Sequence, residues 1–143
     1  MLMSQPVLLY VEDEDAAAFL LQAAIKEANL ELELHRVADG EQALAFLEHS
    51  KGYEGVPDPD MVLLDLNLPR KSGLEVLAAM QHRDSLRKIP VVVFTCSSLP
   101  SDKKRSMDLG AREFITKPTT FESFVAAVKT ACSQLDRADG APG

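Results

Sequence analysis

In Met61-Val62-Leu63-Leu64-Asp65, four apolar residues run directly into an acidic one. A short, continuous apolar run is typical of a strand in a parallel sheet, because such a strand is buried on both faces. The residues from Leu66 to Pro69 do not resemble the first turn of a helix, so N-capping explains the acid at position 65 poorly. The stretch therefore predicts a buried strand that delivers a carboxylate to one end of a sheet.

Strand and helix patterns alternate on both sides of this stretch. Besides 61–64, the predicted strands are 6–11, 32–37, 89–94 and 114–116, and the segment 32–37 alternates apolar and polar residues like an edge strand. The predicted helices begin at Asp15 and Asp39, span 73–81 and 100–109, and close the chain from Phe121 to Leu135. Five such units predict an α/β protein with the flavodoxin-like (βα)5 fold, a doubly wound sheet of five parallel strands in the order 2-1-3-4-5 with helices on both faces.

Two sequence signals mark helix ends. Asp39 and Gln42 have the spacing of a capping box at the start of the second helix. Gly110 directly follows the helix at 100–109, where a residue in the left-handed conformation commonly ends a helix.

The size and composition fit one globular domain. The chain has 143 residues, and we expect a single domain over 1–143 with a core at about 6–135 and a tail at 136–143. The 15 basic and 22 acidic residues give a net charge of −7, which makes nucleic acid a poor partner. No apolar run is long enough to cross a membrane and no signal peptide is recognisable, so we expect a cytoplasmic protein. Cys96 and Cys132 lack the spacing of a disulfide framework or a zinc site and are expected to be reduced residues in or near the core.

Carboxylates follow two strands that are neighbours in the predicted order. Glu12 and Asp13 come after the first strand and Asp65 after the third, so all three are expected at one edge of the sheet. They would repel one another without a cation, and an all-oxygen ligand set suits Mg²⁺. Acids at strand ends can also be solvated helix caps, and for Asp13 alone this alternative stays open.

Two more polar residues reach the same edge. The fourth strand ends in Thr95, and the fifth leads into Lys117-Pro118. A carboxylate, a hydroxyl, an ammonium group and a metal site can together hold the oxygens of a transferring phosphoryl group, whose chemistry depends on positioning and charge neutralisation.

From Val7 to Leu135 the chain resembles the CheY-like receiver domains of two-component signalling. The resemblance rests on Glu12-Asp13 after the first strand, Asp65 after the third, Pro69 and Gly73 downstream of it, Thr95 after the fourth strand, and Lys117-Pro118 after the fifth.

The resemblance implies a role for each of these residues. Asp65 would be the phosphoacceptor, and Mg²⁺ would be bound by Asp13, Asp65 and the main-chain carbonyl of Asn67, with Glu12 helping through water. Lys117 would pair with the phosphoryl group, and its peptide bond to Pro118 is expected to be cis. Thr95 and Phe114 would act as the switch and alter the face formed by the helix at 100–109, the strand at 114–116 and the closing helix. Such a protein is a signalling protein that catalyses only its own phosphorylation and dephosphorylation.

Two residues depart from the usual receiver pattern. Phe114 stands where tyrosine is common, and Cys96 follows Thr95 where alanine or serine is usual.

The segments 52–60 and 65–73 resemble the stand-alone response regulators that partner phytochrome-type histidine kinases. The implied partners are a sensor histidine kinase of that type and an unknown downstream protein. A homodimer through the face that includes the helix at 100–109 is a further hypothesis.

Three alternatives fit the same fold. A receiver-like binding module could signal without phosphorylation, although the complete set of acid, threonine and lysine residues argues against it. A flavin electron carrier needs a phosphate-binding loop after the first strand, where the acids from Glu12 to Asp15 would repel the cofactor. An aspartate-nucleophile phosphatase would be expected to carry its nucleophile on the first strand.

Overall fold

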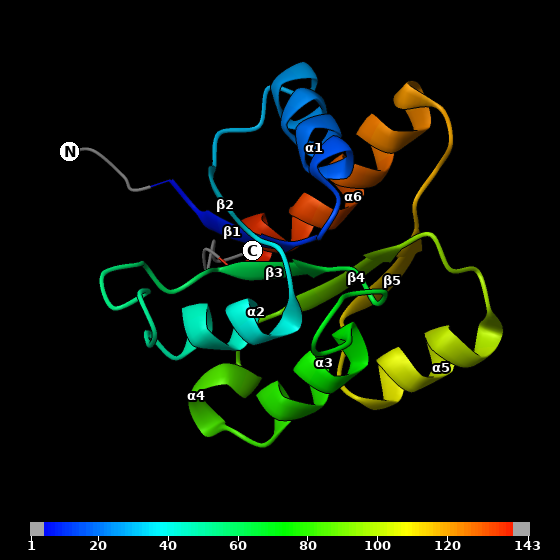
Figure 1. The fold of residues 1–143 in the computed structure, drawn as a ribbon. Coiled ribbons are helices and arrows are strands. Elements are labelled where there is room, and N and C mark those ends of the chain that lie inside the picture. The colour runs from blue at the N-terminus through cyan, green and yellow to red at the C-terminus, as the bar shows by residue number, and fades with distance from the viewer. Residues whose placement is uncertain (1–4, 139–143) are drawn as a thin grey trace.

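The computed structural model describes residues 5–138 and shows a sheet between two layers of helices (Figure 1). Five parallel strands form the sheet in the order β2-β1-β3-β4-β5. The strands are β1 (Val7–Val11), β2 (Glu33–Val37), β3 (Met61–Leu64), β4 (Val91–Thr95) and β5 (Glu113–Thr116). The helices are α1 (Asp15–Glu27), α2 (Gly40–Leu47), α3 (Gly73–Gln81), α4 (Asp84–Arg87), α5 (Pro100–Asp108) and α6 (Phe121–Ala138). The predicted flavodoxin-like fold and its strand order are confirmed.

Two apolar clusters fill the space between the layers. α1 and α6 cover one face of the sheet, where Leu8 and Phe94 are buried, and α2 and α3 cover the other, where Leu9 and Val93 are buried (Figure 1). Successive side chains of a strand point to opposite faces, so each central strand contributes to both clusters. β1, β3 and β4 are therefore buried along their whole length, which explains their unbroken apolar sequences.

β2 and β5 form the two edges of the sheet. Both are partly exposed, in contrast to the three central strands. The alternating pattern of the segment 32–37 thus correctly predicted an edge strand.

Helix ends follow the sequence signals closely. Asp39 caps α2 by accepting a hydrogen bond from the Gln42 backbone N–H at 2.8 Å, while the Gln42 side chain accepts from Ala38 and not from Asp39. Gly110 has φ +97 after α5, and its N–H donates to the Met107 carbonyl at 3.0 Å. This is the left-handed helix end that the position of the glycine predicted.

α5 buries few of its side chains against the rest of the domain. Of its nine side chains only Ser106 is buried, and the Ser106 hydroxyl donates to the Asp102 carbonyl within the same helix. Leu99 and Met107, at the two ends of α5, are both exposed.

The structure differs from the predictions in several details. The single turn α4 was not predicted, and α6 runs to Ala138, beyond the point where the tail was expected to begin, while residues 139–143 lie outside the described part of the chain. Cys132 is buried as expected, but Cys96 is exposed because it lies beyond the end of β4. Among residues 5–138, no helix combines the length and the apolar character that crossing a membrane requires.

Candidate functional site

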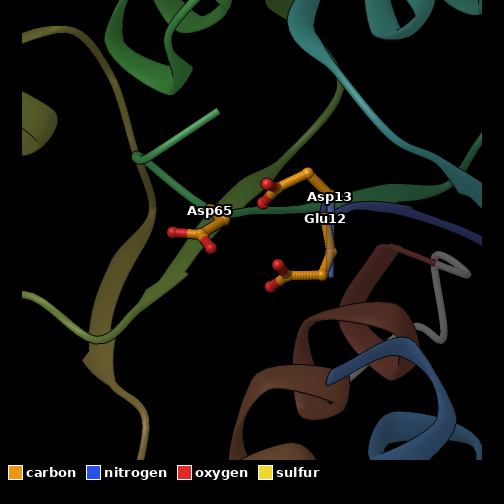
Figure 2. Close-up of side chains that lie close together, drawn as sticks. All are labelled: Glu12, Asp13 and Asp65. Carbon is orange, nitrogen blue, oxygen red and sulfur yellow. The ribbon is translucent and has the colours of Figure 1, made fainter. Parts of the chain in front are cut away.

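The three predicted carboxylates converge at the carboxyl ends of β1 and β3 (Figure 2). These strands are paired with Val11 opposite Leu64, so the residues that follow them are also neighbours. Carboxylate oxygens of Glu12, Asp13 and Asp65 lie within 4.8 Å of one another. Glu12 and Asp65 are buried while Asp13 is exposed, so the cluster opens to solvent on one side. The three carboxylates carry more negative charge than a single nearby lysine can balance. Their clustered oxygen atoms are suitable ligands for a hard divalent cation.

Lys117 is the cation closest to this cluster. Its ammonium group pairs with Glu12 Oε1, lies 3.4 Å from Asp65 Oδ2, and is 5.9 Å from the centre of the Phe94 ring. Burial lowers the pKa of Lys117, but the hydrogen bond with Glu12 and the negative charges of Asp65 and Glu12 outweigh burial and raise it. The lysine is therefore charged at neutral pH and holds the two buried acids together.

Asp65 lies in an environment that opposes its ionisation. Burial is the largest effect and raises the pKa of Asp65, and the charge of Glu12 raises it further. Lys117 acts in the opposite direction, as does the Asn67 backbone N–H, which donates to Asp65 Oδ1 at 3.2 Å. The net pKa of Asp65 is raised, so additional positive charge at the site would stabilise the ionised carboxylate.

The remaining predicted site residues surround the cluster. Thr95 is fully buried at the end of β4, and Asn67 is exposed in the loop that follows β3. Phe114 lies on β5 opposite Val93 and is partly buried against the cluster beneath α2 and α3. The structure thus places Thr95, Asn67 and Lys117 next to the acids and Phe114 on the neighbouring edge strand.

The predicted cis bond before Pro118 is wrong. Every peptide bond within residues 5–138 is trans, including the bond from Lys117 to Pro118. The trans form is favoured by about 0.5–1 kcal/mol even before proline, so a cis bond needs specific support from its surroundings.

Three residues at the site were not among those predicted from the sequence. Tyr10 is buried, and its hydroxyl donates to Glu12 Oε1 at 3.2 Å. Burial strongly raises the pKa of Tyr10, so the hydroxyl stays protonated and acts as the donor. A tyrosine in an otherwise aliphatic strand was the only available hint.

Arg36 and Ser97 are the other two site residues that were not predicted from the sequence. Arg36 on β2 donates from Nε to the Glu12 carbonyl at 2.8 Å and from a terminal nitrogen to Asp15 at 2.7 Å, which ties the loop after β1 to the neighbouring strand. Ser97 donates its N–H to Thr95 Oγ1 at 3.4 Å and its hydroxyl to Asp102 of α5 at 2.5 Å. Ser97 therefore connects the end of β4 to α5.

Gly73 sets how closely α3 approaches the site. A Cβ atom added to Gly73 would lie 2.3 Å from the Asp65 carbonyl oxygen and 2.7 Å from Leu66 Cα. Both are backbone atoms of the segment that presents the carboxylate, so they cannot turn aside as a flexible side chain can. The start of α3 thus packs directly on the Asp65 backbone.

Gly73→Ala is expected to lower the free energy of unfolding by about 2–3 kcal/mol, because overpacking against fixed backbone forces either α3 or the Asp65 loop to move. Gly55→Ala is the matched control, since a Cβ at Gly55 meets no atom within 4 Å. Urea unfolding followed by circular dichroism measures both variants. Equal stabilities of the two variants would show that the contact at Gly73 is not tight.

The sequence and the fold are similar to those of known proteins. Residues 8–129 match the family model for the response regulator receiver domain. The chain is 39% identical over 123 residues to the response regulator Rcp1 of Synechocystis sp., a match that covers 86% of this chain and 84% of Rcp1. The phosphorylated cyanobacterial phytochrome response regulator RcpA superposes with a TM-score of 0.85 at 35% identity, over 91% of this chain and 93% of RcpA. The Mn²⁺-bound form of Rcp1 superposes with a TM-score of 0.82 at 38% identity, over 90% of this chain and 92% of Rcp1.

Proposed function

Because this chain belongs to the response regulator receiver domain family of two-component signalling, we propose that it accepts a phosphoryl group on Asp65 in a Mg²⁺-dependent reaction. The observation that carries the proposal is the arrangement of Asp65, a buried carboxylate beside two further acids and 3.4 Å from the Lys117 ammonium group. This arrangement supplies a nucleophile, oxygen ligands for a cation and a fixed positive charge in one place.

The proposed reaction moves a phosphoryl group from a phosphohistidine of a kinase to Asp65. A carboxylate oxygen of Asp65 forms a bond to phosphorus while the phosphorus–nitrogen bond breaks, and the imidazole leaves with the electron pair. Water later attacks the acyl phosphate, which releases inorganic phosphate and restores the carboxylate. Both steps take place on the protein's own side chain, so the protein acts as a phosphoacceptor and not as an enzyme that turns over an external substrate.

The acids of the cluster would bind the Mg²⁺ ion. Asp13, Asp65 and the main-chain carbonyl of Asn67 are the proposed ligands. Glu12 would act through a water molecule, because Lys117 and Tyr10 donate to its Oε1 and the Glu14 N–H donates to its Oε2. When bound, Mg²⁺ supplies positive charge to the phosphoryl oxygens. The Mn²⁺-bound form of Rcp1 supports a divalent cation at this kind of site.

Thr95 and Phe114 are the proposed switch residues. Thr95 Oγ1 accepts the Ser97 N–H, and the Ser97 carbonyl accepts from Thr116 on β5 at 2.9 Å. The Thr95 side chain already hydrogen-bonds to Asp65, so a phosphoryl group there would be within its reach, and a shift of Thr95 toward that group would stretch the bond from the Ser97 N–H and disturb the start of α5. Phe114 has no hydroxyl, so we propose that its part in the switch depends on packing.

The face formed by α5, β5 and α6 is the proposed output surface. It would bind a downstream protein or a second copy of this chain. Its charged residues, the candidates for pairs between two copies, are Lys103, Lys104, Arg105, Asp108, Arg112 and Glu113. Lys104 and Asp108 already pair within α5 at 2.9 Å, and exposed ion pairs contribute little individually, so any dimer would depend on several contacts.

The proposed phosphodonor is a sensor histidine kinase of the phytochrome type, and the cytoplasm is the proposed location of this chain. The likeness to the phytochrome response regulator RcpA supports this choice. The test is phosphotransfer from a panel of purified, autophosphorylated histidine kinases that includes phytochrome-type members. We expect rapid transfer from a phytochrome-type kinase in the presence of Mg²⁺ and a large loss of transfer when EDTA removes the ion.

The outcomes separate the parts of this proposal. Transfer that is preferred from another kinase would leave the phosphoacceptor role intact and contradict the phytochrome partner. A wild-type mass that no kinase and no small phosphodonor changes would favour a binding module that signals without phosphorylation.

A further inference from the structure

Tyr10 is a buried polar residue that the proposed chemistry does not use. Its side chain is fully buried among the apolar residues beneath α1 and α6, where a phenylalanine would fill the same space. Side chains two residues apart on a strand point to the same face, and this places the Tyr10 hydroxyl beside Glu12. The hydrogen bond to Glu12 Oε1 at 3.2 Å is the one that the hydroxyl makes within the described part of the chain.

Glu12 Oε1 accepts from two donors of different kinds. One is the neutral Tyr10 hydroxyl and the other is the Lys117 ammonium group. The second carboxylate oxygen, Oε2, accepts from the Glu14 backbone N–H at 3.1 Å. Glu12 is fully buried, so each of these donors replaces water that the carboxylate has lost.

Lys117 faces two competing acceptors. Its ammonium group is bonded to Glu12 and lies 3.4 Å from Asp65 Oδ2, which is longer than an ordinary charged hydrogen bond. A phosphoryl group on Asp65 adds oxygens that attract the ammonium group away from Glu12. Without a second donor, Glu12 Oε1 would then be a buried acceptor with no hydrogen bond, which is energetically costly.

We propose that Tyr10 is a positioning residue, whose hydroxyl stays on Glu12 and thereby frees Lys117 to pair with the phosphoryl group. This inference rests on the proposed phosphoryl acceptance at Asp65. Tyr10 does not touch the reacting atoms and acts only through Glu12 and Lys117.

The first test measures the rate at which acetyl phosphate phosphorylates Asp65 at saturating Mg²⁺, followed by intact mass. In this reaction an Asp65 oxygen bonds to phosphorus while the bond to the acetate oxygen breaks, and acetate leaves with the electron pair. Tyr10→Phe is expected to lower the rate constant about tenfold, as the loss of one donor to a buried acceptor implies. Tyr53→Phe is the matched control, because Tyr53 packs against Phe46 in the other apolar cluster, and is expected to leave the rate unchanged.

The second test asks whether the effect passes through Glu12. In a Glu12→Gln background, Tyr10→Phe is expected to change the rate less than twofold, because the amide no longer holds the ammonium group as a carboxylate does. A readout that needs no reaction is the ¹³C resonance of the Glu12 carboxylate in metal-free protein. We expect it to shift in Tyr10→Phe and not in Tyr53→Phe.

Each outcome bears on a different statement. Phosphorylation of wild type together with an unchanged rate in Tyr10→Phe, or an unchanged Glu12 resonance, overturns the role of Tyr10 alone. An equal loss in both Glu12 backgrounds also overturns it, since the effect would then come from packing. A wild-type protein that gains no phosphoryl mass overturns the proposed function, and the role of Tyr10 falls with it.

Discussion

Asp65→Asn is expected to abolish phosphoryl acceptance and, at neutral pH, to raise the free energy of unfolding. The amide cannot act as the nucleophile, so intact mass should show no phosphoryl addition from acetyl phosphate or from a phosphorylated kinase. Asp84→Asn is the matched control, because it makes the same substitution at an exposed carboxylate that pairs with Arg87 and is not part of the acidic cluster. A variant that still gained one phosphoryl group would show that another side chain is the acceptor.

The gain in stability follows from the raised pKa of Asp65, for which burial is the largest cause. A carboxyl whose pKa is higher in the folded than in the unfolded state binds protons more tightly when folded. Its contribution to stability is present below the unfolded pKa and is lost as the pH rises through the folded pKa. At pH 7 the ionised carboxylate therefore destabilises the fold, and the neutral amide is expected to be more stable by about 1 kcal/mol.

Urea unfolding of wild type and Asp65→Asn across pH 4 to 8 checks the sign. The advantage of the variant should be largest near neutral pH and should shrink on acidification, as wild-type Asp65 becomes protonated. A variant that is less stable than wild type at pH 7 would mean that the attraction of Lys117 outweighs burial.

Lys117→Met is expected to lower the free energy of unfolding by about 3–5 kcal/mol, since breaking a buried ion pair leaves an uncompensated charge. This is the largest loss of stability expected among the variants proposed for this protein. Methionine has similar length and no charge, so Glu12 would keep its burial and lose its cation. The same variant should be phosphorylated far more slowly, because the positive charge beside Asp65 is gone. Thermal and urea unfolding measure the loss of stability, and intact mass measured over time gives the rate of phosphorylation.

The pH dependence and two further variants test the cause. The pKa of Lys117 is raised on folding, so its stabilisation is complete below the ordinary lysine pKa and is lost only as the pH rises through the higher folded pKa. The stabilisation lost through deprotonation of Lys117 itself should therefore not appear below about pH 9. Lys104→Met is the control, since Lys104 makes an exposed ion pair with Asp108 and should cost less than about 0.5 kcal/mol.

Restoring charge balance should restore stability. The double variant Glu12→Gln with Lys117→Met removes both charges of the Glu12–Lys117 pair and leaves Asp65 as the one ionised acid of the two, so it is expected to recover more than half of the loss. A loss in Lys117→Met no larger than that in Lys104→Met would contradict the buried ion pair.

The sequence predicted the fold and the placement of the acids because both depend on local patterns. An unbroken apolar run at 61–64 can be satisfied only between two layers, and parallel strands bring their carboxyl ends to one edge. Once the strand order is known, Glu12, Asp13 and Asp65 must be neighbours. The roles of these residues in phosphotransfer stay predictions.

The details that escaped prediction depend on contacts between distant segments or on weak local preferences. Arg36 reaches the Glu12 carbonyl from the edge strand, 24 residues away, and no local pattern indicates this. The single turn of α4 is too short for a periodic signal. The bond before Pro118 could be either isomer as far as the sequence is concerned, since the two differ by about 1 kcal/mol before any tertiary contact.

Because α5 buries so few side chains, the packing on the two sides of Asp65 is unequal. On one side, the first residue of α3 touches the Asp65 backbone, so that helix cannot shift without deforming the loop. On the other side, α5 removes little apolar surface from water and is joined to the site through Ser97, so displacing it disturbs few buried contacts. We therefore expect a small rearrangement at Asp65 to displace α5 more easily than α3, which would carry the change to the proposed output surface.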